Sequence, residues 1–518
     1  MLSTLAWYFY CSIVATLKLA LFIIGGLAAF LIFVRIRYNI RSKTQFPYTD
    51  RDFAFEQDKY RDILAYDANS LIIRGKRIFL VSGEFHYWRV PDRSRWESIL
   101  KTYKSCGFNC IRIYFHWGYH SPKEGVYHFD GNRDIDYLLQ LCSKLKIFVL
   151  AAPGPYICAE TQGGGFPLWL IAKRDVGLRH MSWLFKLWDY KFAEYSKQWI
   201  DHIMPILKKH QITEKEDGCV LAVQLENELF EFWSWLPIGF VDEMKSLAKF
   251  TRDLGITVPL FTNDPWEEGG FVSRPENNKE DNFWTKWISP RGFGLDWYGF
   301  DKYATFPPSA TPDPIGPFKE LEIENWGEWD PNSFASQIDH IEDKVRSFGG
   351  EAAKTPILIP ELQGGWFSHN CLKTTYDHNY TFFGEHFTKT IFDSVVAQGS
   401  TMVSLYMVYG GTNWGTLGDP DVYSSYDYGA CIREYGHISG RMRRLRQSLL
   451  MYRSFEKYFV RTQRDDLPFI TASESNIISS QRCYEAYLDR IGETGYKANQ
   501  DVELTLVRNF NENESPFF

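Results

Sequence analysis

The chain has 518 residues and a formal net charge of −7 at pH 7, from 57 basic and 64 acidic side chains. This near balance of charges argues against a nucleic-acid-binding surface. The length allows a large hydrophobic core, since a single α/β barrel takes about 250 residues and can exceed 400 with insertions.

The first 34 residues contain a long apolar stretch. Residues 5–34 are apolar apart from small polar side chains and Lys18. The run 19–34 alone is slightly short for a bilayer, which needs about 20 residues. Counting back past Lys18 makes the run long enough, because lysine can extend its ammonium group toward the membrane surface. A signal peptide is the competing interpretation, but no small-x-small cleavage site follows a short apolar region. We therefore predict a transmembrane anchor over 5–34.

The side of the membrane is a separate question. Four basic residues directly follow the apolar run: Arg35, Arg37, Arg41 and Lys43. The positive-inside rule would place the downstream domain in the cytoplasm. Two N-glycosylation triplets, 379–381 and 513–515, favour the opposite side but occur by chance in most chains of this length. We expect a single-pass protein whose large domain is lumenal or extracellular, against the charge rule, and this choice depends on the enzyme interpretation below.

The rest of the chain divides into a polar stalk at 35–67, a large domain at 68–456 and a short tail at 457–518. The large domain alternates strands and helices. The predicted strands are 78–82, 109–115, 147–152, 219–225, 258–262, 295–300, 356–359 and 402–409. The predicted helices are 94–106, 135–144, 186–210, 241–254, 334–348, 380–398 and 437–455. Several strands are unbroken apolar runs, as expected for parallel strands covered on both faces. The sequence thus predicts a (β/α)₈ TIM barrel of the α/β class, with a partial β-rich segment at the C-terminus.

Nine cysteines, at 11, 106, 110, 142, 158, 219, 371, 431 and 483, form no C-x-x-C pair and no cluster with histidine. The sequence therefore predicts no metal site, and no organic cofactor is expected. Cys106, Cys110, Cys142, Cys158 and Cys219 lie in apolar patterns and are expected to be buried thiols. One or two disulfides remain open, without an assigned pairing.

Two glutamates stand at the ends of predicted strands. Glu228 follows the strand at 219–225, and Glu361 follows the strand at 356–359. In a barrel the carboxyl ends of all strands meet at one face, so the two carboxylates can face each other. A single glutamate at a strand end more often forms a cap or an ion pair. A pair of carboxyl groups across one cavity is what cleavage of a glycosidic bond requires, with retention at a separation of about 5 Å and inversion at about 6.5–9.5 Å. The aromatic content of 17% fits either a large core or sugar-stacking surfaces.

Eight short motifs make the resemblance to one family specific. They are SGEFHY at 82–87, APGPYICAE at 152–160, GGGFP at 163–167, QLENE at 224–228, PELQGG at 360–365, LYM at 405–407, GGTNWG at 410–415 and SYDYG at 425–429. Through them the chain resembles glycoside hydrolase family 35, the β-galactosidases, and most of all their secreted fungal branch. The motifs cover about residues 70 to 455 in family order.

The resemblance implies a role for each matching residue. Glu228 would be the general acid/base and Glu361 the nucleophile. Asn227 would hold the 2-hydroxyl of the sugar. Apart from the resemblance, Glu226 lies two residues before Glu228 on the same strand face and is expected to be a partner of Glu228 rather than a catalyst. The remaining pocket residues would be Tyr114, Cys158, Ala159 (through its backbone), Glu160, Tyr303 and Tyr428. The fungal branch usually has Asn where this chain has Cys158, which leaves one polar contact in doubt. Gly118 and Ser121 also depart from the residues common after the tryptophan at 117.

Three functions stay open at this point. The first is a retaining exo-β-galactosidase that removes terminal β-linked galactose from a glycan or oligosaccharide. The second is an exo-β-glycosidase of another sugar preference, such as a glucosaminidase. The third is an inactive, membrane-tethered sugar-binding protein. The expected absence of the family's β-rich tail domains, which predicts either a fragment or a natural short form, is the feature that favours the third.

Overall fold

The computed structural model describes residues 2–45, 50–180, 191–229, 240–273, 293–303, 338, 340–368, 375–420, 422–461, 463–464 and 508–509. Its centre is a sheet of eight parallel strands in the order β4-β11-β10-β9-β8-β7-β6-β5. A parallel bridge between Glu84 and Arg112 joins the first and last strands and closes the barrel. The strands are β4 (Leu80–Gly83), β5 (Cys110–Tyr114), β6 (Phe148–Ala152), β7 (Val220–Gln224), β8 (Leu260–Asp264), β9 (Trp297–Phe300), β10 (Leu358–Gln363) and β11 (Met402–Tyr406). The predicted (β/α)₈ barrel is confirmed.

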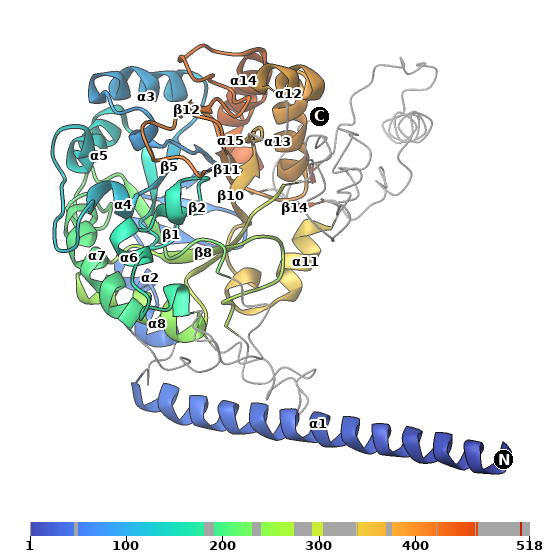
Figure 1. Cartoon of the computed structure of the whole chain (residues 1–518). Coiled ribbons are helices and arrows are strands. Elements are labelled where there is room, and N and C mark those ends of the chain that lie inside the picture. The colour runs from blue at the N-terminus through green and yellow to red at the C-terminus, as the bar shows by residue number, and fades with distance from the viewer. Residues whose placement is uncertain are drawn as a thin grey trace, which may run out of the picture.

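Helices surround the barrel strands (Figure 1). The longer ones are α3 (Trp96–Ser105), α5 (Ile135–Leu145), α7 (Lys191–Lys208), α8 (Phe240–Asp253), α11 (Ile341–Ser347), α12 (Tyr376–Phe383), α13 (Phe387–Ala397) and α14 (Gly440–Ser454). Single turns are α2 (Gln57–Tyr60), α4 (Trp117–His120), α6 (Leu168–Ile171) and α15 (Glu456–Phe459). Helix α5 shows why they form: the Asp134 side chain accepts a hydrogen bond from the Tyr137 N–H at its start, and Lys146 ends it in a left-handed conformation.

The first predicted strand spans two elements in the structure. Its residue 78 belongs to β3 (Lys76–Ile78), the last strand of a small antiparallel sheet with β1 (Leu64–Tyr66) and β2 (Leu71–Ile73). The barrel strand β4 then begins at Leu80. Between them the Phe79 N–H donates to the Glu456 carboxylate at 2.8 Å rather than to a neighbouring strand. The unbroken apolar run hides this change of partner.

The segment expected as a stalk is partly folded onto the barrel. Helix α1 (Leu2–Gln45) extends through residues 35–45, and from Phe53 onward side chains of the chain pack against the large domain. Phe53 and Phe55 are only 6% and 7% exposed. The Phe55 N–H donates to Asp296 Oδ1 at 2.6 Å, and Arg252 Nε donates to the Phe53 carbonyl at 3.0 Å. The predicted stalk is thus attached to the barrel through Phe53 and Phe55, although most of its other residues up to 63 are exposed.

Within helix α1, the segment Ser12–Phe33 is long and apolar enough to cross a membrane, judged by length and composition.

The first expected N-glycosylation site, Asn379, lies in α12 and is buried, and its amide donates to Ser368 Oγ at 3.2 Å. A buried asparagine in a folded helix is a poor site for glycosylation. The second triplet, at 513–515, lies outside the described residues.

At the C-terminal end the structure describes one small pairing, between β14 (Gln463–Arg464) and β15 (Arg508–Asn509). The rest of the predicted β-rich segment lies outside the described residues, as do most of the long connections after β8 and β9. The expected buried thiols Cys106, Cys110, Cys142 and Cys219 are confirmed as buried free cysteines, whereas Cys158 is half-buried. Cys371 and Cys483 lie outside the described residues.

Candidate active site

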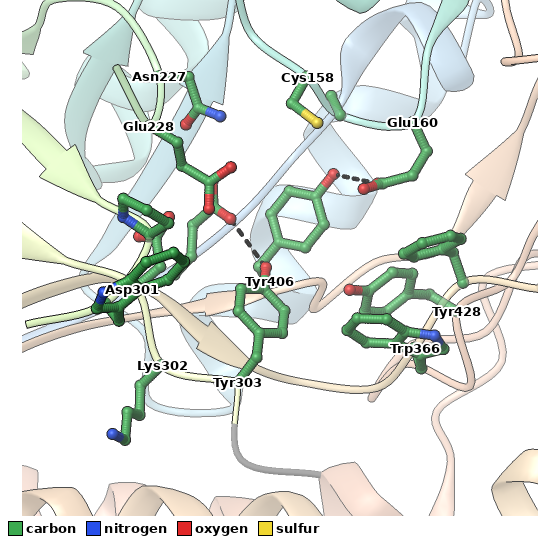
Figure 2. Close-up of a pocket in the computed structure, with 15 residues that line it drawn as sticks. Cys158, Glu160, Asn227, Glu228, Asp301, Lys302, Tyr303, Trp366, Tyr406 and Tyr428 are labelled. Atoms are coloured by element: carbon green, nitrogen blue, oxygen red, sulfur yellow. Dashed lines mark hydrogen bonds between the residues drawn. The ribbon is translucent and has the colours of Figure 1, made fainter. Parts of the chain in front are cut away.

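A cavity of about 370 Å³ lies at the carboxyl ends of the barrel strands, within the size range of small-ligand sites. Figure 2 shows it from one side, with Cys158 and Glu160 across the cavity from Glu228 and Asp301. Residues from the ends of six strands line it: Cys158, Ala159, Glu160, Asn227, Glu228, Pro265, Trp266, Asp301, Lys302, Tyr303, Glu361, Trp366, Phe367, Tyr406 and Tyr428. The predicted convergence of Glu228 and Glu361 on one cavity is therefore found in the structure.

Glu361 lies on β10 and is surrounded by hydrogen-bond donors. Arg112 Nη1 donates to Glu361 Oε1 at 2.9 Å, and the Tyr114 hydroxyl donates to the same oxygen. On the other side the Tyr303 hydroxyl donates to Oε2 at 2.8 Å. Donors aimed at both oxygens, one of them a buried guanidinium, favour the ionised form of a carboxyl group.

Glu228 has the opposite surroundings. It follows β7 and no arginine or lysine hydrogen-bonds to its carboxyl group among the described residues. Burial raises the pKa of Glu228 to about 7, and the nearby Glu361 carboxylate adds to the rise. The two carboxyl groups of one cavity therefore have different surroundings: hydrogen-bond donors engage both oxygens of Glu361, whereas burial raises the pKa of Glu228 to about 7.

A tight turn at the end of β7 aims Glu228 into the cavity. Glu226 and Glu228 both have left-handed backbones, with φ of 62° and 46°. Arg179 Nη2 donates to the Glu226 carboxylate and to the Asn227 carbonyl, both at 2.7 Å. Asn263 adds a third support by accepting the Glu228 N–H at 3.3 Å. Non-glycine residues in this region cost energy, and these contacts hold the turn in place. Glu226 thus supports the turn that carries Glu228.

A second strained turn follows β6. Cys158, Ala159 and Glu160 are three successive left-handed residues, with φ of 53°, 52° and 41°. The buried Arg89 guanidinium donates to the Ala159 carbonyl at 2.6 Å and to the Glu160 carbonyl at 3.1 Å. The same group stacks 3.5 Å from the centre of the Tyr426 ring. Arg89 therefore fixes the turn that brings Cys158, Ala159 and Glu160 to the cavity wall.

Glu160 is anchored by two tyrosines. The Tyr406 hydroxyl donates to Glu160 Oε2 at 2.9 Å, a bond drawn in Figure 2, and the Tyr426 hydroxyl donates to the same oxygen. Burial raises the pKa of Glu160. One oxygen of the Glu160 carboxyl group thus accepts hydrogen bonds from the two tyrosines, while the residue still lines the cavity. This arrangement is expected of a group that binds a ligand hydroxyl.

Tyr114 takes a different place from the one expected. It is fully buried and is not among the residues that line the cavity. Its hydroxyl contacts the Glu361 carboxylate and the Asn227 amide oxygen from behind. Tyr114 therefore connects two cavity residues to each other, whereas Cys158, Ala159, Glu160, Asn227, Tyr303 and Tyr428 all line the cavity as expected.

Sequence reasoning missed several residues of the site. Tyr406 lies in the LYM motif at 405–407, which was noted without a role. Arg112 bonds Glu361, Glu84 Oε2 at 3.1 Å and Gln224 Oε1 at 2.9 Å from inside the barrel. Burial raises the pKa of Glu84 to about 8. Glu84 belongs to the first motif, at 82–87, and could have been selected from it. No spacing rule in the sequence links Glu84 to Arg112.

Aromatic side chains surround the mouth. Trp266, 41% exposed, follows β8, and Trp366 stacks on Phe367 with ring centres 4.8 Å apart after β10. Lys302 beside them is paired with Glu267 at 2.8 Å. Among the described residues no group of three or more His, Cys, Asp or Glu side chains is arranged to hold a metal ion.

Residues 70–291 and 311–452 match the family described as glycosyl hydrolases family 35. A probable beta-galactosidase C from Aspergillus niger is 31% identical over 386 residues, which cover 74% of this chain and 34% of that protein. A probable beta-galactosidase B from Sclerotinia sclerotiorum is 32% identical over 389 residues, with 73% and 34% covered. Among solved structures, an exo-beta-1,4-mannosidase from an Opitutaceae bacterium has a TM-score of 0.48 at 14% identity, covering 74% of this chain and 61% of that one.

The chain spans about a third of the length of the curated relatives it matches. The matched segments contain seven of the eight barrel strands and every residue that lines the cavity except Asp301, Lys302 and Tyr303, which follow β9 in the unmatched stretch 292–310. The chain belongs to glycosyl hydrolases family 35.

Proposed function

We propose that the protein is a retaining exo-β-galactosidase, which removes terminal β-linked galactose from an oligosaccharide or glycan without a metal or organic cofactor. The observation that carries the proposal is the contrast between Glu361 and Glu228. One carboxyl group is bonded by three donors, the other has a pKa raised to about 7, and both line one cavity. Family membership and the names of the relatives support galactose as the sugar.

In the first step the Glu361 carboxylate attacks the anomeric carbon of the bound sugar. The bond between that carbon and the leaving oxygen breaks, and protonated Glu228 gives its proton to this oxygen. The products are a galactosyl ester on Glu361, an ionised Glu228 and the free alcohol. Arg112 and Tyr303 hold Glu361 in position for the attack.

In the second step ionised Glu228 takes a proton from a water molecule while the water oxygen attacks the anomeric carbon. The ester bond breaks, Glu361 is again a carboxylate and Glu228 is again protonated. Two inversions at the same carbon give net retention. Asn227, whose amide oxygen accepts a hydrogen bond from Asn263 Nδ2 at 2.9 Å, would bond the 2-hydroxyl, a contact that strengthens in the transition state.

The side of the cavity across from Glu228 would select galactose. Glu160 lines the cavity between its two tyrosine partners, and Tyr428 and the half-buried Cys158 complete that side. The exposed Trp266 and the Trp366–Phe367 pair at the mouth are suited to stack on the sugar ring next along the chain.

The helix Ser12–Phe33 has a mean hydropathy of 2.3, with Lys18 as its one charged residue, and is 0% buried against the rest of the chain. This supports a single-pass membrane anchor. The lumenal or extracellular side is proposed for the barrel because glycans are displayed there. The basic residues after the helix argue for the other orientation, so a protease-protection assay on sealed microsomes decides between the two.

The activity is tested with the full chain purified in detergent. A chromogenic β-galactoside and the matching β-glucosaminide are assayed in parallel, beside Glu361→Gln as the inactive control. We expect turnover of the galactoside and, by proton NMR, the β-anomer as first product. Preferred turnover of the glucosaminide would replace the sugar assignment, α-anomer formation would replace the mechanism, and folded protein without turnover of either would end the enzyme proposal.

A further inference from the structure

A third carboxyl group lines the same cavity and has no part in the steps above. Asp301 follows β9, is 0% exposed, and lies among the residues that surround Glu228 and Glu361. Its oxygen Oδ1 is buried and has no hydrogen-bond partner among the described residues. The Glu228 carboxyl lies within hydrogen-bonding reach of the Asp301 side chain, and Figure 2 shows both on the same side of the cavity.

A chain of hydrogen bonds fixes which Asp301 oxygen can carry a proton. Arg112 Nε can only donate, so the Gln224 oxygen faces it, and Gln224 Nε2 then donates to Asn263 Oδ1 at 2.7 Å. The Glu228 N–H, also only a donor, points at the same Asn263 oxygen at 3.3 Å. Asn263 Nδ2 is therefore the donor to Asp301 Oδ2 at 2.6 Å. Oδ2 accepts this bond and Oδ1 has no partner among the described residues, so we assign a proton on Asp301 to Oδ1.

The charges around Asp301 favour that proton. Glu228 and Glu361 face it, and the charged Arg112 is engaged by Glu84 and Glu361. Tyr114 and Tyr303 are further titratable neighbours, and Lys302, next in the chain, lines the same cavity and pairs with Glu267 at 2.8 Å. No lysine or arginine donates to Asp301 among the described contacts. Burial and the two glutamates hold the pKa of Asp301 well above its usual range.

We propose that Asp301 is a positioning residue for the acid/base Glu228, held as a neutral carboxylic acid whose Oδ1 proton is donated to the Glu228 carboxylate formed after the first chemical step. The proton stays on Asp301, so no net transfer occurs. The hydrogen bond holds Glu228 toward the sugar while it waits to activate water. This inference deepens the proposed function and rests on it.

The kinetic test compares Asp301→Ala and Asp301→Asn with the wild-type chain, using the pH profile of kcat/KM and of kcat. Alanine removes the donor that stabilises ionised Glu228. The alkaline limb of the Asp301→Ala pH profile should therefore move to higher pH by on the order of one pH unit, the size expected for loss of a hydrogen bond to a charged group. Its kcat should fall on the order of tenfold. Asparagine keeps a donor, so it should keep the position of the limb and restore part of kcat.

Two kinetic results would overturn the proposal. If Asp301 were ionised, asparagine would remove a negative charge beside Glu228 and move the alkaline limb to lower pH. If Asp301 were only structural, neither variant would move the limb, whatever its effect on kcat.

A spectroscopic arm does not depend on turnover. Infrared difference spectra of wild type against Asp301→Asn at pH 7 should contain the band of one protonated carboxyl group. Absence of that band rejects a neutral Asp301. If wild type hydrolyses no galactoside, the proposed function fails, and this band still decides the state of Asp301.

Discussion

The roles of Glu228 and Glu361 can be distinguished by the activity that remains when each side chain is replaced by alanine. Glu228→Ala should keep activity on substrates with good leaving groups, which need no proton, and added azide should restore turnover by entering where water is normally activated. Glu361→Ala should lose on the order of 10³-fold or more on every substrate and should not recover in this way. Steady-state rates on an aryl galactoside and on a disaccharide, with and without azide, measure this difference. Equal losses on both substrates in Glu228→Ala would show that the roles are wrongly assigned.

The pH dependence follows from the raised pKa of Glu228. The first step needs the protonated form, and that form is lost as pH rises through about 7. The kcat/KM for a disaccharide should therefore fall on the alkaline side of about pH 7. An aryl galactoside with a good leaving group serves as the control, because its first step needs no proton and its kcat/KM should lose this limb. A limb at the same pH for both substrates would point to another group.

The turn after β6 depends on one residue of another element, Arg89. Arg89→Ala would leave two buried carbonyls and Asn413 Oδ1 without their donor and remove the stacking on Tyr426. We expect a loss of about 3–5 kcal/mol in unfolding free energy and a raised KM, because Glu160 is no longer held at the wall. Denaturant titration and KM for galactoside measure the two effects.

The matched control is Arg89→Lys, which keeps the charge but not the planar fork. Arg89→Lys should recover part of the lost unfolding free energy, but its KM should stay nearly as high as in Arg89→Ala. Recovery of both by lysine would show that charge alone, rather than the two carbonyl contacts, maintains the turn.

The strands of the barrel could be predicted because each is an apolar run covered on both faces, and Glu228 and Glu361 because each ends such a run. The turns at 158–160 and 226–228 could not be predicted. Their left-handed residues are not glycine, and the arginines that stabilise them, Arg89 and Arg179, are distant in sequence. Tyr114 illustrates a related limit: its place at a strand end was correct, but whether it faces the cavity or the residue behind it depends on packing.

At the scale of the whole molecule, the boundary of the folded domain lies earlier than the sequence suggested. Removal of residues 1–45 should leave a barrel that unfolds cooperatively, because packing against the barrel begins at Phe53. Removal of residues 1–67 should cost much more, since Phe53 and Phe55 are buried and a buried Phe→Ala change alone costs about 3–5 kcal/mol. Thermal unfolding of both truncations in the same buffer measures this. Equal unfolding midpoints for the two truncated chains would show that residues 50–67 do not stabilise the barrel.

Chemical trapping of the sugar on the protein tests the account most directly. A 2-fluoro-galactosyl fluoride slows the second step more than the first, so the ester should accumulate and be found by mass spectrometry of proteolytic peptides. We predict one galactosyl group on Glu361, formed more slowly at alkaline pH in wild type and absent in Glu361→Gln. A label on another residue, or turnover of the galactoside that never yields a labelled protein, would contradict the account.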